Sequence, residues 1–320
     1  MFFVSGVMMK KVPSFSEQLF EAVKNKQLEK VRFLVALGAD VKYHDNQFRT
    51  CLMFCDDVRI ADFLISQGAD VNAIGNGGYT PLFYAKDKKV AKFLIEHGAN
   101  MEAHDCFNTN ILMYALRSKQ VDKALVLIDS GANIKAIDDN GYSVLRYAVK
   151  ADLVDVAEII IDKGGEVNDC GVALRRSLWW NVKSADMAKL LLKNNISVKG
   201  RDNLGNSDLV ASVYQGDCGV VRELLNAGID VNERNNDGDT ALMIFLSKDK
   251  FDTEKCWYND EARETNKKIV RMLLKSGANV LIKNNKGQSA LRLASSDMRK
   301  FIIDEIKRGK REPLLFQYMR

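Results

Sequence analysis

A short phrase that returns along the chain is the feature that most constrains the fold. Residues 68–71 read GADV, and close copies begin at 38, 98, 131, 164, 195, 228 and 277. The intervals between successive copies are 30, 30, 33, 33, 31, 33 and 49 residues. A near-constant period in this range indicates a repeat architecture, in which each copy is one supersecondary unit.

Apolar residues keep fixed places around the first letter of each phrase. The fourth and third residues before it are aliphatic in all eight copies, as in Leu64-Ile65. The third residue after it is always apolar: Val41, Val71, Met101, Ile134, Val167, Val198, Val231 and Val280. This regularity predicts that the same positions are buried in every copy.

A second phrase follows about twelve residues beyond each copy of the first. It reads TCLMFC at 50, TPLFYA at 80, NILMYA at 110, SVLRYA at 143, SLWWNV at 177, SDLVAS at 207, TALMIF at 240 and SALRLA at 289. Its third letter is Leu in seven copies and Trp179 in the eighth, which we therefore assign to the core. An earlier relative, EQLFEA at 17, raises the expected number of units to nine.

Each unit contains signals for two helices and a loop. Thr, Ser or Asn before an apolar run is typical of a helix N-cap, and Pro81 suits the first helical position. The Gly of the first phrase favours the left-handed conformation that ends a second helix. The following stretch, VNAIGNGGY in one copy, has the Gly and Asn content of a tight turn or hairpin.

Stacking is required for these units to be stable. Helices shorter than about 12–15 residues are marginal in water, so each unit must bury its apolar face against its neighbours. Small residues such as Ala85 and Ala148 allow adjacent helices to approach closely. We predict an all-α solenoid over residues 16–308, with units opening near 17, 50, 80, 110, 143, 177, 207, 240 and 289, a loosely packed tail at 1–15 and a basic, apolar tail at 309–320.

These phrases resemble the ankyrin repeat family over about residues 17–308. The family hallmark D-x-x-G-x-T-P-L-H-x-A is similar to residues 80–85, with Phe83 in place of His, and residues 68–73 match G-A-D-V-N-A. The resemblance implies helix-turn-helix units joined by β-hairpin-like loops. It also implies a non-enzymatic scaffold that binds another protein.

Several copies depart from the family pattern. The turn Gly before the cap, present at five places such as Gly78, is replaced by Phe48, Asn108 and Arg175. Because Phe and Arg poorly tolerate a left-handed backbone, we predict reshaped turns near residues 48 and 175. Units opening at 50, 80 and 177 lack three residues and should have shorter helices or a shorter turn. The register over 165–182 stays open.

One unit carries an insertion. Thr240 precedes Gly277 by 37 residues, where the longer normal spacing is 21, so sixteen extra residues fall near 248–266. We expect them between the two helices of that unit. Two interpretations are open: a tolerated loop or lengthened helix pair, or a docking feature that presents Trp257 and Tyr258.

The sequence contains no pattern that indicates catalysis or a cofactor. Nucleotide-binding, hydrolase and metalloprotease motifs are absent, and the chain has only three His. Its six Cys match neither a disulfide framework nor a zinc set, which favours the cytoplasm or another reducing compartment. Cys51 and Cys55 should pack in the core, with a metal site at these two residues as the weaker alternative. A separate minor candidate is a chance surface metal site at His44, His104 and Cys106. No apolar run is long enough for a membrane span.

The family resemblance assigns a candidate partner-binding face to the hairpin tips and first helices. Carried over position by position, it contains His44, Arg49, Ile74, Tyr79, His104, Phe107, Ile137, Tyr142, Arg201, Leu204 and Arg234. Tyr79, Phe107 and Tyr142 are the most attractive because exposed aromatic residues are favoured anchors. The alternative for each is packing on a neighbouring hairpin, and Trp180 fits either role.

Charge suggests one alternative function. Residues 267–320 carry 14 Lys/Arg and 4 Asp/Glu, which would suit a basic adaptor for nucleic acid or an anionic membrane surface. Such an end is more often the solvated outside of a terminal unit, so we do not expect nucleic acid as a partner. The leading prediction is a monomeric scaffold without metal or cofactor that binds another protein.

Overall fold

A computed structural model describes residues 13–168, 177–247 and 260–309. Contacts divide the chain into two compact units, Met1–Ala136 (unit 1) and Ile137–Arg320 (unit 2), which are described separately. Within the described residues there are helices and isolated antiparallel bridges but no strand. The structure thus has the helical character that the repeat period predicts.

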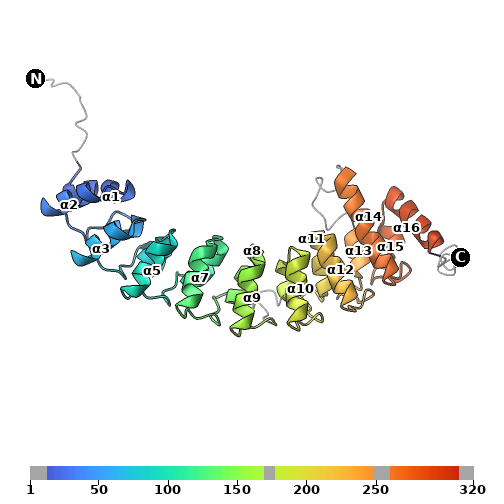
Figure 1. The fold of residues 1–320 in the computed structure, drawn as a ribbon. Coiled ribbons are helices and arrows are strands. Elements are labelled where there is room, and N and C mark those ends of the chain that lie inside the picture. The colour runs from blue at the N-terminus through green and yellow to red at the C-terminus, as the bar shows by residue number, and fades with distance from the viewer. Residues whose placement is uncertain (1–12, 169–176, 248–259, 310–320) are drawn as a thin grey trace, which may run out of the picture. The chain divides into compact units, whose positions relative to one another are not determined.

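Unit 1 is a series of stacked helix pairs, coloured blue to green in Figure 1. First helices pack on first helices, as α4 does on α6, and second helices pack on second helices, as α3 does on α5. Its elements are α1 (Phe15–Lys24), α2 (Leu28–Ala36), η1 (Cys51–Phe54), α3 (Val58–Ser66), η2 (Asn76–Gly78), α4 (Pro81–Tyr84), α5 (Lys88–Glu96), α6 (Ile111–Arg117) and α7 (Val121–Asp129).

Unit 2 repeats this arrangement. First helices α11 and α13 are in contact, as are second helices α10 and α12, and α12 and α14. Its elements are α8 (Val144–Ala151), α9 (Val154–Asp162), η3 (Leu178–Asn181), α10 (Ala185–Lys193), α11 (Asp208–Gln215), α12 (Cys218–Asn226), α13 (Ala241–Leu246), α14 (Asp260–Lys275), α15 (Ala290–Leu293) and α16 (Ser296–Arg308).

The core consists of the repeated apolar positions. The third letter of the second phrase is less than 2% exposed in every copy: Leu52, Leu82, Leu112, Leu145, Trp179, Leu209, Leu242 and Leu291. The core assignment of Trp179 is therefore confirmed. Cys51 and Cys55 are also buried, and burial raises the pKa of the Cys51 thiol to about 12 and that of Cys55 to about 11. Both thiols are core groups, as predicted.

The helix ends confirm the predicted Gly termini, whereas the predicted side-chain caps form at only some of the helix starts. Gly68 has a φ of 88°, and the Ala69 N–H donates to the Leu64 carbonyl at 2.9 Å, which closes α3 as the sequence predicts. At the helix starts, the side chains of Asn110, Ser143 and Thr240 accept from the backbone N–H of the third helical residue. Among the described residues no such side-chain cap forms at Thr50, Thr80, Ser177, Ser207 or Ser289. Four of these five precede helices of only four residues, in which the N–H of the third helical residue donates to the backbone carbonyl of the cap residue instead, as Phe83 does to Thr80 at 3.0 Å.

The turn at residue 48 is not reshaped, so that prediction was wrong. Phe48 adopts a φ of 56°, close to the 58° of Asn108 and the 72° of Gly141. The Phe48 N–H donates to the Asp45 carbonyl at 2.9 Å, as Gly141 donates to Asp138. The hairpin bonds hold Phe in a left-handed conformation that costs a non-Gly residue about 1–2 kcal/mol. The predicted turn at Arg175 lies outside the described residues.

The repeats that open at 50, 80 and 177, which lack three residues found in longer copies, have short first helices, as predicted. The elements η1, α4 and η3 contain four residues each, whereas α6 contains seven and α8 eight. Long side chains bind backbone carbonyl groups of these short helices. Lys123 donates to the Phe83 carbonyl at 2.9 Å, and Gln215 donates to the Trp179 carbonyl at 3.1 Å.

The insertion contributes to a longer second helix. Helix α14 contains 16 residues, whereas α12 contains nine. Residues 260–266 of the expected insertion therefore belong to α14, which favours a lengthened helix for this part. Trp257 and Tyr258 lie outside the described residues.

Candidate partner-binding surface

Two hairpins of unit 1 are held by their own acidic side chains, Asp45 and Asp105, and the hairpin between them is held by backbone bonds such as Gly75 N–H to the Tyr79 carbonyl at 2.8 Å. The Asp105 Oδ1 atom accepts from the backbone N–H groups of Phe107 and Thr109, both at 2.9 Å. Antiparallel bridges close two of these hairpins, His44 to Thr50 and His104 to Asn110. The residues at the tips are thus presented on a backbone with fixed hydrogen bonds.

Large apolar side chains are exposed at three successive tips of unit 1. Phe48 is 54% exposed, Ile74 is 70% exposed and Phe107 is 61% exposed. Ile74 and Phe107 were candidates from sequence, whereas Phe48 was not. The sequence signal for Phe48 was its place in the turn, where most other copies have Gly. A Phe at this position adds a large side chain at the hairpin tip, which a Gly would lack.

Tyr79 has a different environment from these tips. It is half-buried, and its ring centroid lies 5.1 Å from that of Phe83 and 5.9 Å from that of Tyr114. It belongs to an aromatic row on the first helices that continues to Tyr84 and Phe54. The structure therefore places Tyr79 against neighbouring first helices and not at an isolated tip.

The polar candidates of unit 1 bond within their own hairpin. Both Nε and Nη2 of Arg49 donate to Asp45 Oδ2, at 2.8 and 2.6 Å. Partial burial acts to raise the pKa of Asp45, but the bonds from Arg49 outweigh it, so the pKa lies below its usual value. The ring of His44 lies 5.1 Å from that of Phe48, and His104 is exposed.

Unit 2 has its own exposed apolar residues. Ile137 is 58% exposed and Leu204 is 65% exposed, both in hairpin segments. Tyr142 is half-buried, with the Arg146 guanidinium carbon 5.2 Å above its ring centroid and the Tyr147 ring at 6.5 Å. Among the apolar candidates of unit 2, Ile137 and Leu204 therefore face solvent, whereas Tyr142 does so only in part.

Arg201 and Arg234 join adjacent hairpins. Arg201 donates to the Gly205 carbonyl of its own hairpin at 3.3 Å and to the Arg234 carbonyl of the next at 3.1 Å. Arg234 repeats the pattern, with bonds of 3.1 Å to the carbonyls of Gly238 and Lys283. This arrangement favours a structural role for both side chains.

Two buried ionisable groups were missed by the sequence interpretation. Lys123 is fully buried, and burial lowers the pKa of its amine to about 7. Burial raises the pKa of Asp208 to about 6, although Ser177 and the Gly200 N–H both donate to its carboxylate. Each group contacts backbone or side chains of its own unit. Among the described residues, no cluster of His, Cys, Asp and Glu has the composition of a metal site.

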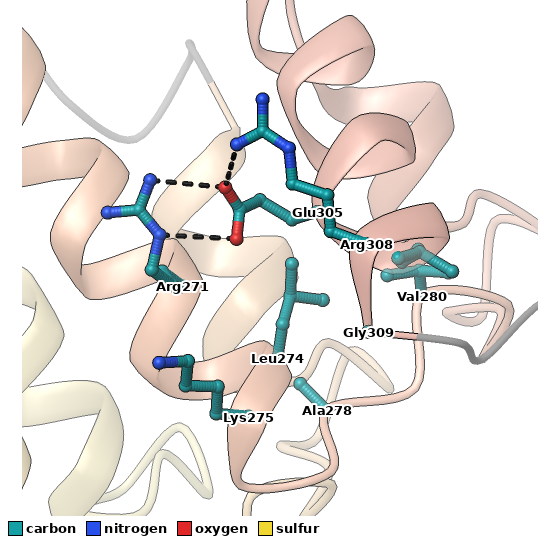
Figure 2. A pocket seen from close by; sticks show the side chains of 9 residues that line it. Arg271, Leu274, Lys275, Ala278, Val280, Glu305, Arg308 and Gly309 are labelled. Atoms are coloured by element: carbon teal, nitrogen blue, oxygen red, sulfur yellow. Dashed lines mark hydrogen bonds and ion pairs between the residues drawn. The ribbon is translucent and has the colours of Figure 1, made fainter.

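Figure 2 shows a pocket of about 340 Å³ near the end of unit 2. Apolar residues including Leu274 and Val280 line it, and the Glu305 carboxylate lies between Arg271 and Arg308. Arg271 bonds to Glu305 at 3.1 and 3.2 Å and lowers the pKa of that carboxyl group. These two arginines of the basic segment are therefore partly neutralised. Residues 310–320 of that segment lie outside the described residues.

Comparison with protein families agrees with the helix pairs and hairpins. The sequence model "Ankyrin repeats (3 copies)" matches residues 19–105 and 86–170, and the model "Ankyrin repeat" matches residues 237–285. Together the matches cover more than half of the chain. The chain belongs to the ankyrin repeat family. The predicted fold class, an all-α ankyrin-repeat solenoid, is thereby confirmed.

Ankyrin repeats are generally protein–protein interaction modules, and proteins built from them are typically non-enzymatic scaffolds. This supports a protein partner as the general class of ligand for this ankyrin-repeat chain. A search of curated proteins found no match. In the parts of the chain that the structure covers, every helix is too short or too polar to cross a membrane.

Proposed function

We propose that this ankyrin-repeat chain is a scaffold that binds a partner protein through the hairpin tips of unit 1. Phe48, Ile74 and Phe107 anchor the contact, and the scaffold performs no chemistry of its own. The observation that carries the proposal is the exposure of a large apolar side chain at each of three successive tips. Desolvated apolar and aromatic anchors supply most of the free energy in protein interfaces.

The charge of these hairpins narrows the class of partner. Residues 39–50, 69–80 and 99–110 contain five acidic residues and two basic ones: Asp40, Asp45, Asp70, Glu102, Asp105, Lys42 and Arg49. A partner surface with apolar sockets surrounded by Lys or Arg would be complementary to this face. Opposite charge mainly increases association rate and specificity.

In unit 2, Ile137 and Leu204 form a separate candidate contact set. We expect them to bind apolar partner surface in the same way as the tips of unit 1. Arg201 and Arg234 shape the hairpins through the carbonyl bonds described above, and Tyr142 packs against its own first helix. Their contribution to binding would be indirect.

Backbone strain at Phe48 supports the proposal. A Gly fits the same kind of turn without the left-handed penalty, as at Gly141, and Asn tolerates it better than Phe does, as at Asn108. Strained residues often persist at functional sites. An exposed Phe at a strained position is therefore better explained by contact with a partner than by folding stability.

The experiment is affinity capture with mass spectrometry, using the full chain and two variants as bait. The triple variant Phe48→Asn, Ile74→Ser, Phe107→Ser removes the three anchors, and Tyr214→Ser is the control because Tyr214 is 54% exposed on helix α11 of unit 2. Circular dichroism confirms that each bait is folded. We expect a protein captured by the wild type and the control to be lost with the triple variant. Equal capture by all three baits would refute the proposed face.

A further inference from the structure

A second apolar surface lies on the second helices of unit 1. Helices α2, α3 and α5 each have Phe at the sixth position, giving Phe33, Phe63 and Phe93 at intervals of 30 residues. Phe33 is 62% exposed, and the other two are half-buried. Leu37, one helical turn beyond Phe33, is 46% exposed. This stripe belongs to helices and is distinct from the hairpin tips.

Basic side chains accompany the stripe. The Arg32 guanidinium carbon lies 5.9 Å from the centroid of the Phe63 ring, and the His97 ring lies 3.9 Å from that of Phe93. The three helices carry six basic residues, all exposed, and three acidic ones: Lys30, Arg32, Arg59, Lys88, Lys89, Lys92, Glu29, Asp62 and Glu96. These helices therefore have a net charge of +3, or +1 when Asp57 and Asp122, which pair with Arg59 and Lys88, are included, whereas the hairpins of the same unit have −3.

We infer that α2, α3 and α5 form a second docking surface, and that its ligand is an acidic amphipathic helix of a partner protein. Its apolar residues bind the Phe stripe, and its Glu and Asp residues bind the surrounding Lys and Arg. Charge complementarity selects an acidic ligand. This surface lies outside the hairpin face and does not depend on it.

The spacing of the stripe matches the spacing of a helical ligand. Helix α3 packs against both α2 and α5, and packed helices lie about 8–10 Å apart. Seven residues of an α-helix rise about 10.5 Å. A ligand helix that crosses α2, α3 and α5 therefore meets one Phe per heptad, with residues i, i+7 and i+14. The ligand needs about 15 residues, with apolar side chains along one face and acids beside them.

Two surfaces of opposite charge give unit 1 a bridging role. The acidic hairpin face selects an apolar and basic surface, whereas the helix face selects an acidic helix. Because no residue is shared between the two sets, both ligands fit at the same time. The chain is then an adaptor that holds two different proteins together.

The test uses a synthetic probe with the full chain. The probe is a fluorescent amphipathic peptide with Leu on the heptad face and Glu at the flanking positions, and its control is a scrambled peptide of the same composition. Fluorescence anisotropy gives the two dissociation constants. We expect the heptad peptide to bind about tenfold more tightly than the scrambled one, with weakening as salt is raised. Equal affinity for both peptides, or no binding to either, would overturn the inference.

Variants locate the binding surface. Lys89→Glu with Lys92→Glu changes two exposed side chains and should preserve the fold. It should weaken the heptad peptide about fivefold or more, since two favourable exposed pairs become unfavourable. Phe33→Ser should also weaken binding, whereas Ile74→Ser with Phe107→Ser should leave it unchanged. Loss of binding in that hairpin variant alone would place the peptide on the other face and overturn the inference.

An anionic membrane is the competing ligand for a basic, aromatic surface. Co-sedimentation with vesicles that contain phosphatidylserine distinguishes the two. Vesicle binding that Lys89→Glu with Lys92→Glu abolishes, without binding of the heptad peptide, would overturn the inference in favour of a membrane surface. The capture experiment on the hairpin face is unaffected by any of these results.

Discussion

The most quantitative consequence of the structure concerns Lys123. Its side chain is fully buried, and its amine donates to the Phe83 carbonyl at 2.9 Å at the end of the short helix α4. Burial lowers the pKa from 10.5 to about 7. Above about pH 7, the unfolded chain therefore binds a proton that the folded chain does not. Stability must rise with pH in this window and is lost as the pH falls.

The size of the effect follows from the two pKa values. A full difference of one proton is worth about 1.4 kcal/mol per pH unit. Between about pH 7 and pH 9 the folded amine changes from half-protonated to neutral, whereas the unfolded amine stays charged. The free energy of unfolding should therefore increase by about 2 kcal/mol from this residue.

The perturbation is Lys123→Met, which keeps the length of the side chain and removes the titrating amine. The Phe83 carbonyl then lacks its donor, at a cost of about 1–3 kcal/mol that is the same at both pH values. Buried Cys51 and Cys55 have raised pKa values and reduce stability as pH rises, but equally in both proteins. The pH-dependent difference between wild type and variant therefore reports on Lys123.

The assay is urea unfolding followed by circular dichroism at about pH 7 and pH 9. Lys92→Met is the control because the Lys92 side chain is 67% exposed. We expect the wild type and the control to gain about 2 kcal/mol more than Lys123→Met over this interval. If all three proteins change equally, the amine is not held neutral by burial and the reasoning is wrong.

Three further predictions test backbone and hairpin details. Phe48→Asn should raise the free energy of unfolding by about 1 kcal/mol in urea titrations, because Asn tolerates the left-handed turn; a decrease would show that the ring stabilises the fold. Gly78→Ala should cost at least about 2 kcal/mol, since a Cβ there would lie 2.6 Å from a carbonyl oxygen of the next hairpin. Gly38→Ala meets nothing within 4 Å and should lose less in the same assay, so equal losses would refute the clash. Arg234→Ala should accelerate amide exchange in the hairpin at 283–288 and destabilise unit 2 by about 1–3 kcal/mol, and unchanged exchange rates would contradict the proposed link between hairpins.

The repeated apolar positions could be predicted from sequence because each has equivalent packing neighbours in every copy of the repeat. Leu82 and its equivalents are buried by the neighbouring repeats, so the period alone identifies them as core residues. The same holds for Gly68, whose left-handed backbone follows from its place after the second helix. At these positions the local preference of the residue and the repeat period predict the same structure.

Other features depend on contacts that the period does not encode. The turn at Phe48 kept its shape because the bonds of Asp45 outweigh the preference of Phe, and residue preference alone gave the wrong result. The bonds of Arg201 require the carbonyl of the next hairpin, which no local pattern locates. Lys123 had a usable signal, since the equivalent positions in α3 and α5 are the buried Ile60 and Val90.

The candidate surface was predictable only in part. Ile74 and Phe107 follow from their place at the hairpin tips, and both are exposed. Tyr79 belongs to the same hairpin as Ile74 but packs into the aromatic row, because Phe83 and Tyr114 lie beside it. The identity of neighbouring side chains, and not the repeat itself, decides which tip residues face solvent.

Hydrogen exchange with a captured partner shows whether the hairpin tips of unit 1 carry the contact. Exchange rates of the full chain are measured by mass spectrometry with and without that partner. We expect slower exchange in the hairpins at 44–49, 74–79 and 104–109 on binding. Protection confined to other segments, with these three hairpins unchanged, would show that the partner binds elsewhere.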